Sequence, residues 1–240
     1  MFENLSAGWN ARSYTAKDGS VLLYQLHMPE NYDASRKYPF ILFMHGAGSR
    51  CNDNSHIYSP YSKFLRNFES GKYRDEAILL APCCPKEGRW TQARERAQTT
   101  LDFTVAPTVQ MQAVIELLEE VETSLSVDTS RMYIAGNSMG AHATWELLSR
   151  FPDRFAAAIP SAGAGDPSFA ADFGGTAIWI FHGDADPTVP YECSVLMHNA
   201  LFAAGRTDVQ FTTYPGGKHN IWSWVADTEG LYEWMFEKRL

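Results

Sequence analysis

Six short apolar runs, separated by segments with a helical pattern, constrain the fold of this 240-residue chain more than any other feature. The runs span residues 40–44, 77–81, 132–135, 156–159, 178–181 and 211–214. Their composition is typical of strands that are buried on both faces, as in a parallel sheet covered by helices.

The segments between these runs predict crossover helices. Apolar residues recur at close to a helical period over residues 109–125, and the glutamates of that segment lie outside the apolar face. Further helices are predicted over 139–150, 194–204 and 231–239. Strands that alternate with helices imply right-handed βαβ units and a doubly wound sheet, with any active site at the carboxyl ends of the strands.

The N-terminal region has a different pattern. Residues 12–15 and 21–28 flank a turn sequence at 17–20, which predicts an antiparallel hairpin. No repeat, low-complexity tract or flexible linker divides the chain. We therefore expect one α/β domain over residues 1–240: a mostly parallel, twisted sheet with an N-terminal antiparallel hairpin and helices on both faces.

Charge and hydropathy narrow the possible partners. The chain has 20 Lys and Arg against 28 Asp and Glu, and its net charge of −8 opposes binding to nucleic acid or anionic lipid. Its apolar runs are far shorter than the ~20 residues that a membrane span needs. We therefore expect neither nucleic acid nor a membrane as a partner. The N-terminus lacks a basic region followed by an apolar one, so we expect a cytoplasmic protein. No oligomeric state is predicted.

The four cysteines, Cys51, Cys83, Cys84 and Cys193, lack the paired C-x-x-C spacing of a zinc site. A chain of this length does not need a disulfide scaffold. We expect four free thiols, and a bond from Cys51 to Cys83 or Cys84 remains the alternative.

The sequence Gly136-Asn137-Ser138-Met139-Gly140 is a G-x-S-x-G motif between a predicted strand and a predicted helix. A strand-to-helix turn that holds a serine in strained geometry needs small flanking residues, since larger side chains would collide across the turn. The two glycines meet that need. The motif favours Ser138 as a nucleophile, and the alternative is a glycine-rich turn with an incidental serine.

A serine nucleophile needs a base to remove its proton and an acid to hold that base. Asp184 and Asp186 follow the run at 178–181, and His219 follows the run at 211–214. All three therefore lie with Ser138 at the carboxyl edge of the predicted sheet. This arrangement predicts a catalytic triad in which either aspartate is the acid.

Four motifs together resemble the α/β-hydrolase superfamily: H-G-x-G at 45–48, G-x-S-M-G at 136–140, H-G-x-x-D-x-x-V-P at 182–190 and G-x-x-H at 216–219. Within it, the chain is similar to esterases related to dienelactone hydrolase, carboxylesterase/phospholipase, and feruloyl or acetyl-xylan esterases. The resemblance implies that Ser138 is the nucleophile, His219 the base and Asp186 the acid. Asp184 would then be a turn-forming carboxylate.

The resemblance also implies an oxyanion hole and a substrate pocket. The backbone N–H groups of Ala47 and Met139 are the expected oxyanion donors, with Gly48 as the alternative to Ala47. Trp90 and Trp222 are expected to contact substrate, and ordinary core packing is the alternative for both.

The other histidines favour structural roles, and no metal site or nucleotide cofactor is predicted. His45 and His182 end apolar runs and are expected to make structural hydrogen bonds, while His142 follows Ser138 by one helical turn without a carboxylate partner on its own element. No H-E-x-x-H motif or phosphate-binding glycine fingerprint is present.

We therefore expect a serine carboxylic-ester hydrolase that forms an acyl-enzyme and needs no cofactor. Short-chain acyl or hydroxycinnamoyl esters, free or linked to carbohydrate, are the expected substrates, because no long apolar insertion provides a lipase-like lid. A serine peptidase of the same fold and a noncatalytic binding protein are the alternatives.

Overall fold

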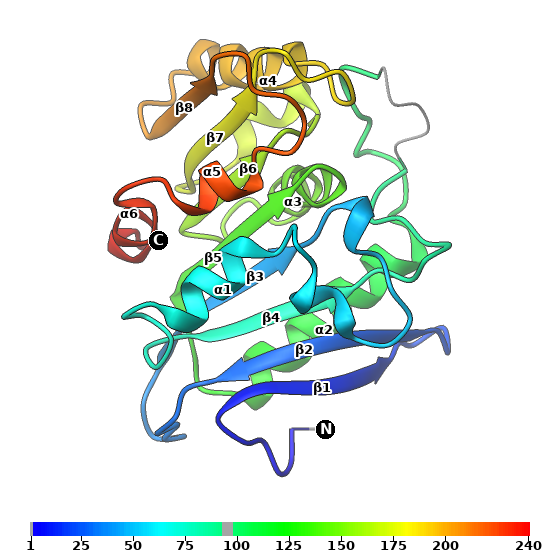
Figure 1. Cartoon of the computed structure of the whole chain (residues 1–240), viewed down its shortest axis with the longest axis vertical. Helices are drawn as coiled ribbons and strands as arrows, with labels where there is room; N and C mark the ends of the chain where they lie inside the picture. The colour runs from blue at the N-terminus through cyan, green and yellow to red at the C-terminus, as the bar shows by residue number, and fades with distance from the viewer. Residues whose placement is uncertain (1, 93–97) are drawn as a thin grey trace.

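A computed structural model of the chain describes residues 2–92 and 98–240. Their strands form one eight-stranded sheet in the order β1-β2-β4-β3-β5-β6-β7-β8 (Figure 1). The strands are β1 (Gly8–Thr15), β2 (Val21–Met28), β3 (Tyr38–Met44), β4 (Ile78–Cys83), β5 (Val127–Asn137), β6 (Ala157–Ser161), β7 (Ala177–Gly183) and β8 (Val209–Tyr214).

The pairing confirms the predicted sheet. Strands β1 and β2 form the N-terminal antiparallel hairpin, and β2 also pairs antiparallel with β4. All pairs from β4 through β3 to β8 are parallel. The hairpin is longer than predicted, because β1 begins at Gly8 and pairs with β2 over its whole length.

Helices cover both faces of the sheet, as expected. The α-helices are α1 (Lys63–Ser70), α2 (Val109–Ser124), α3 (Met139–Arg150), α4 (Glu192–Ala203), α5 (Trp222–Ala226) and α6 (Leu231–Glu237), and the 3₁₀ helices are η1 (Ala47–Ser49), η2 (Ser55–Tyr58) and η3 (Pro167–Asp172). Apolar residues of α2, α3 and α4 join one core cluster, and those of α1, α5 and α6 join the other. Helices α1 and α5 pack against each other on the near side of the sheet in Figure 1.

Burial of the strands follows the apolar runs, with one exception. Every residue of β3, β4 and β6 is buried, as expected for strands covered on both faces. The run at 211–214 was predicted to be equally buried, and this is wrong: the residues of β8 are half-buried or exposed. Because β8 is the edge strand and pairs only with β7, one of its sides has no neighbouring strand.

The parallel strands bring distant segments to one edge of the sheet. Strands β5, β7 and β8 all point the same way, so the residues that follow them meet at their carboxyl ends (Figure 1). Among the described residues, no helix is both long and apolar enough to cross a membrane.

Candidate active site

Ser138 occupies a sharp turn between β5 and α3. Its backbone is in the positive-φ region, with φ 55° and ψ −119°, which L-residues rarely adopt. The turn requires glycine on both sides: a Cβ on Gly140 would lie 1.8 Å from the Met44 carbonyl oxygen, and one on Gly136 would lie 2.2 Å from the Gly140 carbonyl oxygen. The close packing of this turn therefore holds Ser138 in a strained conformation at the edge of the sheet.

A continuous hydrogen-bonded chain links Ser138 to His219 and Asp186. Ser138 Oγ lies 2.9 Å from His219 Nε2, and His219 Nδ1 lies 2.7 Å from Asp186 Oδ2. When the imidazole is neutral, its Nδ1–H donates to the carboxylate and its Nε2 accepts from the serine hydroxyl. Asp184, the other candidate acid, does not take part in these hydrogen bonds. It is exposed and accepts a hydrogen bond at 2.7 Å from the Gly216 N–H.

Asp186 is held by several donors at once. Its side chain is 0% exposed, and its Oδ1 accepts hydrogen bonds from the backbone N–H groups of Thr188 and Val189 at 2.8 and 3.0 Å. Burial alone would raise the pKa of this carboxyl, but hydrogen bonds from His182, His219 and the two backbone N–H groups outweigh burial and hold the pKa below its usual range. The carboxylate is therefore ionised at neutral pH.

His182 also lies beside Asp186, although the sequence predicted only structural hydrogen bonds for this histidine. Its Nε2 lies 3.3 Å from Asp186 Oδ2 and 3.1 Å from the Val189 carbonyl oxygen, while its Nδ1 lies 2.7 Å from Ser194 Oγ. Because both groups near Nε2 are acceptors, this nitrogen carries a proton. The order of His182 and Asp186 after one strand, four residues apart, was the signal that could have indicated this contact.

The residues expected to supply the oxyanion donors line the same pocket as Ser138. Ala47 begins η1 and Met139 begins α3, and the N–H of a first helical residue has no partner within its own helix. Both residues line the pocket together with Ser138 and His219, as does Gly48, the alternative donor.

The pocket at Ser138 is an open cavity of about 410 Å³. Trp222 lines it, and its ring meets the His219 ring edge to face, with the ring centres 5.3 Å apart. Trp90, the other tryptophan expected at the substrate, does not line the pocket. It is fully buried. Its Nε1–H donates to the His45 carbonyl oxygen at 3.0 Å, and its ring packs against the His45 ring.

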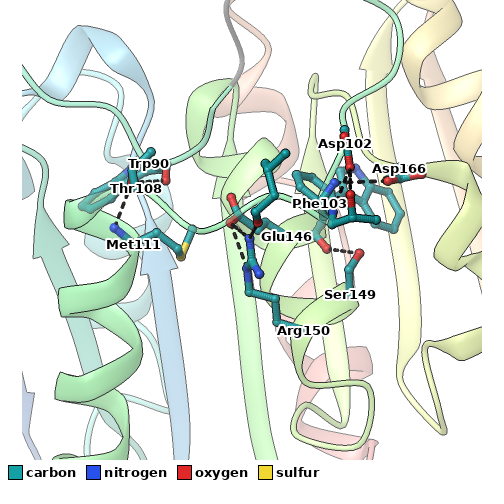
Figure 2. Close-up of polar contacts among 12 residues, drawn as sticks. Trp90, Asp102, Phe103, Thr108, Met111, Glu146, Ser149, Arg150 and Asp166 are labelled. Carbon is teal, nitrogen blue, oxygen red and sulfur yellow. Dashed lines mark hydrogen bonds and ion pairs between the residues drawn. The ribbon is translucent and has the colours of Figure 1, made fainter.

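One wall of the pocket comes from residues 98–108, which contribute Gln98 and Leu101. Hydrogen bonds hold this segment against the rest of the molecule: the Leu101 N–H donates to the Gly165 carbonyl, and the Phe103 N–H donates to Asp166 Oδ2. Figure 2 shows the Phe103 contact together with the anchored end of the segment, where Thr108 caps α2 through the Met111 N–H and also donates to the Trp90 carbonyl.

Arg150 makes a further anchor for this wall. It donates to Glu146 (Figure 2) and to the Val105 carbonyl oxygen, both at 2.7 Å. The nearly buried Glu146 thus positions the arginine that holds the wall. No motif signalled the contact between Arg150 and Val105, since these residues are 45 positions apart in the sequence and meet only in the fold.

His45 and His142 are kept neutral by their surroundings. Burial lowers the pKa of His45 to about 3 and that of His142 to about 4. His45 has the expected structural role, because its Nδ1 lies 2.8 Å from the Gly46 carbonyl oxygen and its Nε2 accepts from the Cys84 N–H. His142 lines the pocket, and its Nε2 has no hydrogen-bond partner among the described residues.

Comparisons with known proteins agree with this geometry. The family model described as "Putative esterase" matches residues 19–227. A thermostable esterase of known structure is 30% identical, with a TM-score of 0.82, and the match covers 97% of this chain and 63% of that one. "Probable feruloyl esterase C" of Aspergillus flavus is 22% identical over 200 residues, which are 82% of this chain and 67% of that protein.

A structure with lower identity shares the fold. The feruloyl esterase module from Clostridium thermocellum complexed with sinapinate is 14% identical, with a TM-score of 0.65, and the match covers 97% of this chain and 89% of that one. The chain spans about two thirds of the length of the fungal relative and of the thermostable esterase. Because the family model matches most of the chain and the sheet, turn and neighbours agree with it, the protein belongs to this esterase family and has the α/β-hydrolase fold.

Proposed function

We propose that this protein is a serine hydrolase of carboxylic esters that works through an acyl-enzyme. The observation that carries the proposal is the unbroken hydrogen-bonded chain from Ser138 Oγ through His219 to Asp186. An isolated serine hydroxyl is a poor nucleophile, whereas one whose proton faces a positioned imidazole can attack a carbonyl carbon.

In the proposed reaction, Ser138 Oγ attacks the ester carbonyl while His219 Nε2 takes its proton. Asp186 stabilises the imidazolium that forms, and the N–H groups of Ala47 and Met139 donate to the developing oxyanion. The imidazolium then gives its proton to the departing alcohol, which leaves the acyl group on Ser138. Water, deprotonated by His219, attacks the acyl carbon and releases the acid.

The proposed substrates carry a short acyl chain or a hydroxycinnamoyl group, free or linked to carbohydrate. The open cavity of about 410 Å³ has room for an aryl ring, and Trp222 offers an aromatic surface beside His219. The similarity to proteins named feruloyl esterase supports the same class.

A substrate panel tests the proposal: p-nitrophenyl esters from acetate to laurate, methyl ferulate, acetylated xylan and a peptide anilide. We expect the highest kcat/KM for acyl chains of roughly two to four carbons or for the ferulate ester. Faster cleavage of the anilide than of any ester would favour a peptidase instead, and turnover that persists in Ser138→Ala would remove the proposed nucleophile.

A Trp222→Ala variant tests the aromatic surface. Removing the indole should lower kcat/KM for methyl ferulate by about 2- to 10-fold, since an aromatic contact is worth roughly 0.5–1.5 kcal/mol, while acetate turnover changes less. Trp224 is the matched control, because it is 49% exposed and does not line the pocket. Equal losses on both substrates would show that Trp222 acts only through His219.

A further inference from the structure

Three buried side chains that the proposed reaction does not use meet beneath the loop after β3. Cys51 follows η1, His56 lies in η2 and Cys83 ends β4, and their exposed fractions are 7%, 2% and 1%. The two sulfur atoms lie 2.7 Å apart, and His56 Nδ1 lies 3.9 Å from Cys51 Sγ. None of the three side chains lines the pocket at Ser138.

The hydrogen bonds of His56 determine which ring nitrogen faces the cysteines as an acceptor. Its Nε2 lies 2.9 Å from the Ala81 carbonyl oxygen, so this nitrogen carries the proton. The lone pair of Nδ1 therefore points toward Cys51, where it can accept the thiol proton.

The two thiols are unequal. Burial alone would raise the pKa of Cys51, but hydrogen bonds with His56 and Cys83 outweigh burial and lower the pKa to about 6. Burial raises the pKa of Cys83. At neutral pH this cluster pairs a thiolate with a thiol, which is the combination that thiol–disulfide exchange needs.

A metal ion or a covalent bond could occupy such a cluster, and the sulfur separation distinguishes them. Two thiolates bound to one tetrahedral zinc ion, each at about 2.3 Å, lie roughly 3.8 Å apart. A disulfide holds its sulfur atoms about 2.05 Å apart. The observed 2.7 Å is too short for two zinc ligands, and it is closer to the covalent arrangement.

We propose that Cys51 and Cys83 are a disulfide-forming pair, oxidised by a low-molecular-weight disulfide such as oxidised glutathione. The Cys51 thiolate attacks one sulfur of the oxidant, which forms a mixed disulfide and expels one thiolate. Cys83 loses its proton, attacks Cys51 Sγ and expels the second thiolate. The two cysteines lose two electrons and two protons in total, and the oxidant becomes two thiols.

This bond would fix the loop that supplies the pocket with Ala47, Gly48 and Arg50. The loop already contacts the end of β4, because the Cys51 N–H donates to the Cys84 carbonyl oxygen at 3.2 Å. A disulfide between positions 32 apart in the sequence would add a covalent tie and restrict the unfolded chain.

Thiol counting and peptide mapping test the pairing directly. The purified protein is incubated with oxidised glutathione, unfolded in guanidinium and alkylated before and after reduction. We expect two alkylated cysteines before reduction, four after it, and a mass 2 Da lower in the oxidised chain. Cys84→Ser is the matched control, because it should keep the bond, whereas Cys51→Ser and Cys83→Ser should lose it.

Thermal unfolding gives an independent measurement. Reductant should lower the Tm of the oxidised wild type and of Cys84→Ser by roughly 5–15 °C, and it should leave Cys51→Ser and Cys83→Ser unchanged. Four alkylated cysteines in the unreduced protein, a stable glutathione adduct, a bond to Cys84, or stoichiometric zinc that protects Cys51 and Cys83 would each overturn the proposal. None of these readouts depends on esterase activity.

Discussion

At the scale of single residues, the two aspartates after β7 provide the sharpest comparison. Asp186 accepts a hydrogen bond from His219, whereas Asp184 accepts one from the Gly216 N–H. Asp186→Asn should lower kcat by about 10⁴, because an amide no longer stabilises the imidazolium or fixes its tautomer. Asp184→Asn should stay within about 10-fold of the wild type. The reverse order, with both proteins folded by circular dichroism, would mean that Asp184 is the acid.

The contact between His182 and Asp186 indicates a positioning role for this histidine. We predict that His182→Ala lowers kcat by about 10–100-fold with little change in KM, because Asp186 loses a donor and moves relative to His219. His182→Gln should recover part of the loss, since its amide nitrogen can replace Nε2–H. Steady-state kinetics on a neutral acetate ester separate kcat from KM. A loss confined to KM, or no recovery in the glutamine variant, would contradict a positioning role.

At the scale of elements, the turn between β5 and α3 depends on its glycines. A methyl group on Gly140 would overlap the Met44 carbonyl oxygen, so Gly140→Ala should lower the free energy of unfolding by about 3 kcal/mol or more. Gly175→Ala is the control, because its new Cβ would meet only Leu240 Cδ2 at 3.7 Å. Urea unfolding measures both variants. Equal stabilities would show that the turn tolerates a side chain and that Ser138 is not held as described.

The elements also show what the sequence could predict. Apolar runs marked every strand from β3 to β8, and α3 was predicted with its observed bounds because a glycine turn and Pro152 mark its ends. Helices α1 and α5 were not predicted, since they have only 8 and 5 residues and show too few turns for a period. Trp90 was expected at the substrate from the family resemblance alone, which does not reveal that its indole is fully buried and donates to the His45 carbonyl oxygen.

Contacts between separate elements could not be predicted in the same way. The order of Ser138, Asp186 and His219 in the chain, each after a strand, was enough to place all three at one edge of the sheet. The anchors of the pocket wall were missed, because Arg150 and the Val105 carbonyl lie on segments whose approach depends on tertiary packing. Sequence pattern thus indicated the residues of the proposed triad but not the groups that position its surroundings.

At the scale of the whole molecule, strand register brings the three residues of the proposed triad together. In the parallel pairing, Asn137 of β5 lies opposite Ser161 of β6, and Gly183 of β7 lies opposite Tyr214 of β8. The strands therefore end at a similar level, and the loops that carry Ser138, Asp186 and His219 converge at the carboxyl edge of the sheet. The pocket lining contains two arginines, Arg50 and Arg89, although the whole chain has a net charge of −8.

The stability of the whole molecule should report the ionisation of Asp186. Its pKa is lower in the folded state than the value of about 3.9 in an unfolded chain, so the unfolded state binds more protons in acid. Its contribution to stability is present above that unfolded value and is lost as the pH falls toward the folded pKa. Between pH 6 and 3, urea unfolding should show a steeper loss in the wild type than in Asp186→Asn. Parallel pH profiles would contradict an ionised, hydrogen-bonded Asp186.

Covalent labelling of the wild type with a fluorophosphonate is the most direct test of whether Ser138 is the activated nucleophile. Such a reagent reacts with a serine that a neighbouring base activates, and the adduct can be located by peptide mass spectrometry. We expect one adduct per chain, located on Ser138, with labelling abolished in Ser138→Ala and strongly slowed in His219→Ala. An adduct on another serine, or undiminished labelling of Ser138→Ala, would contradict it.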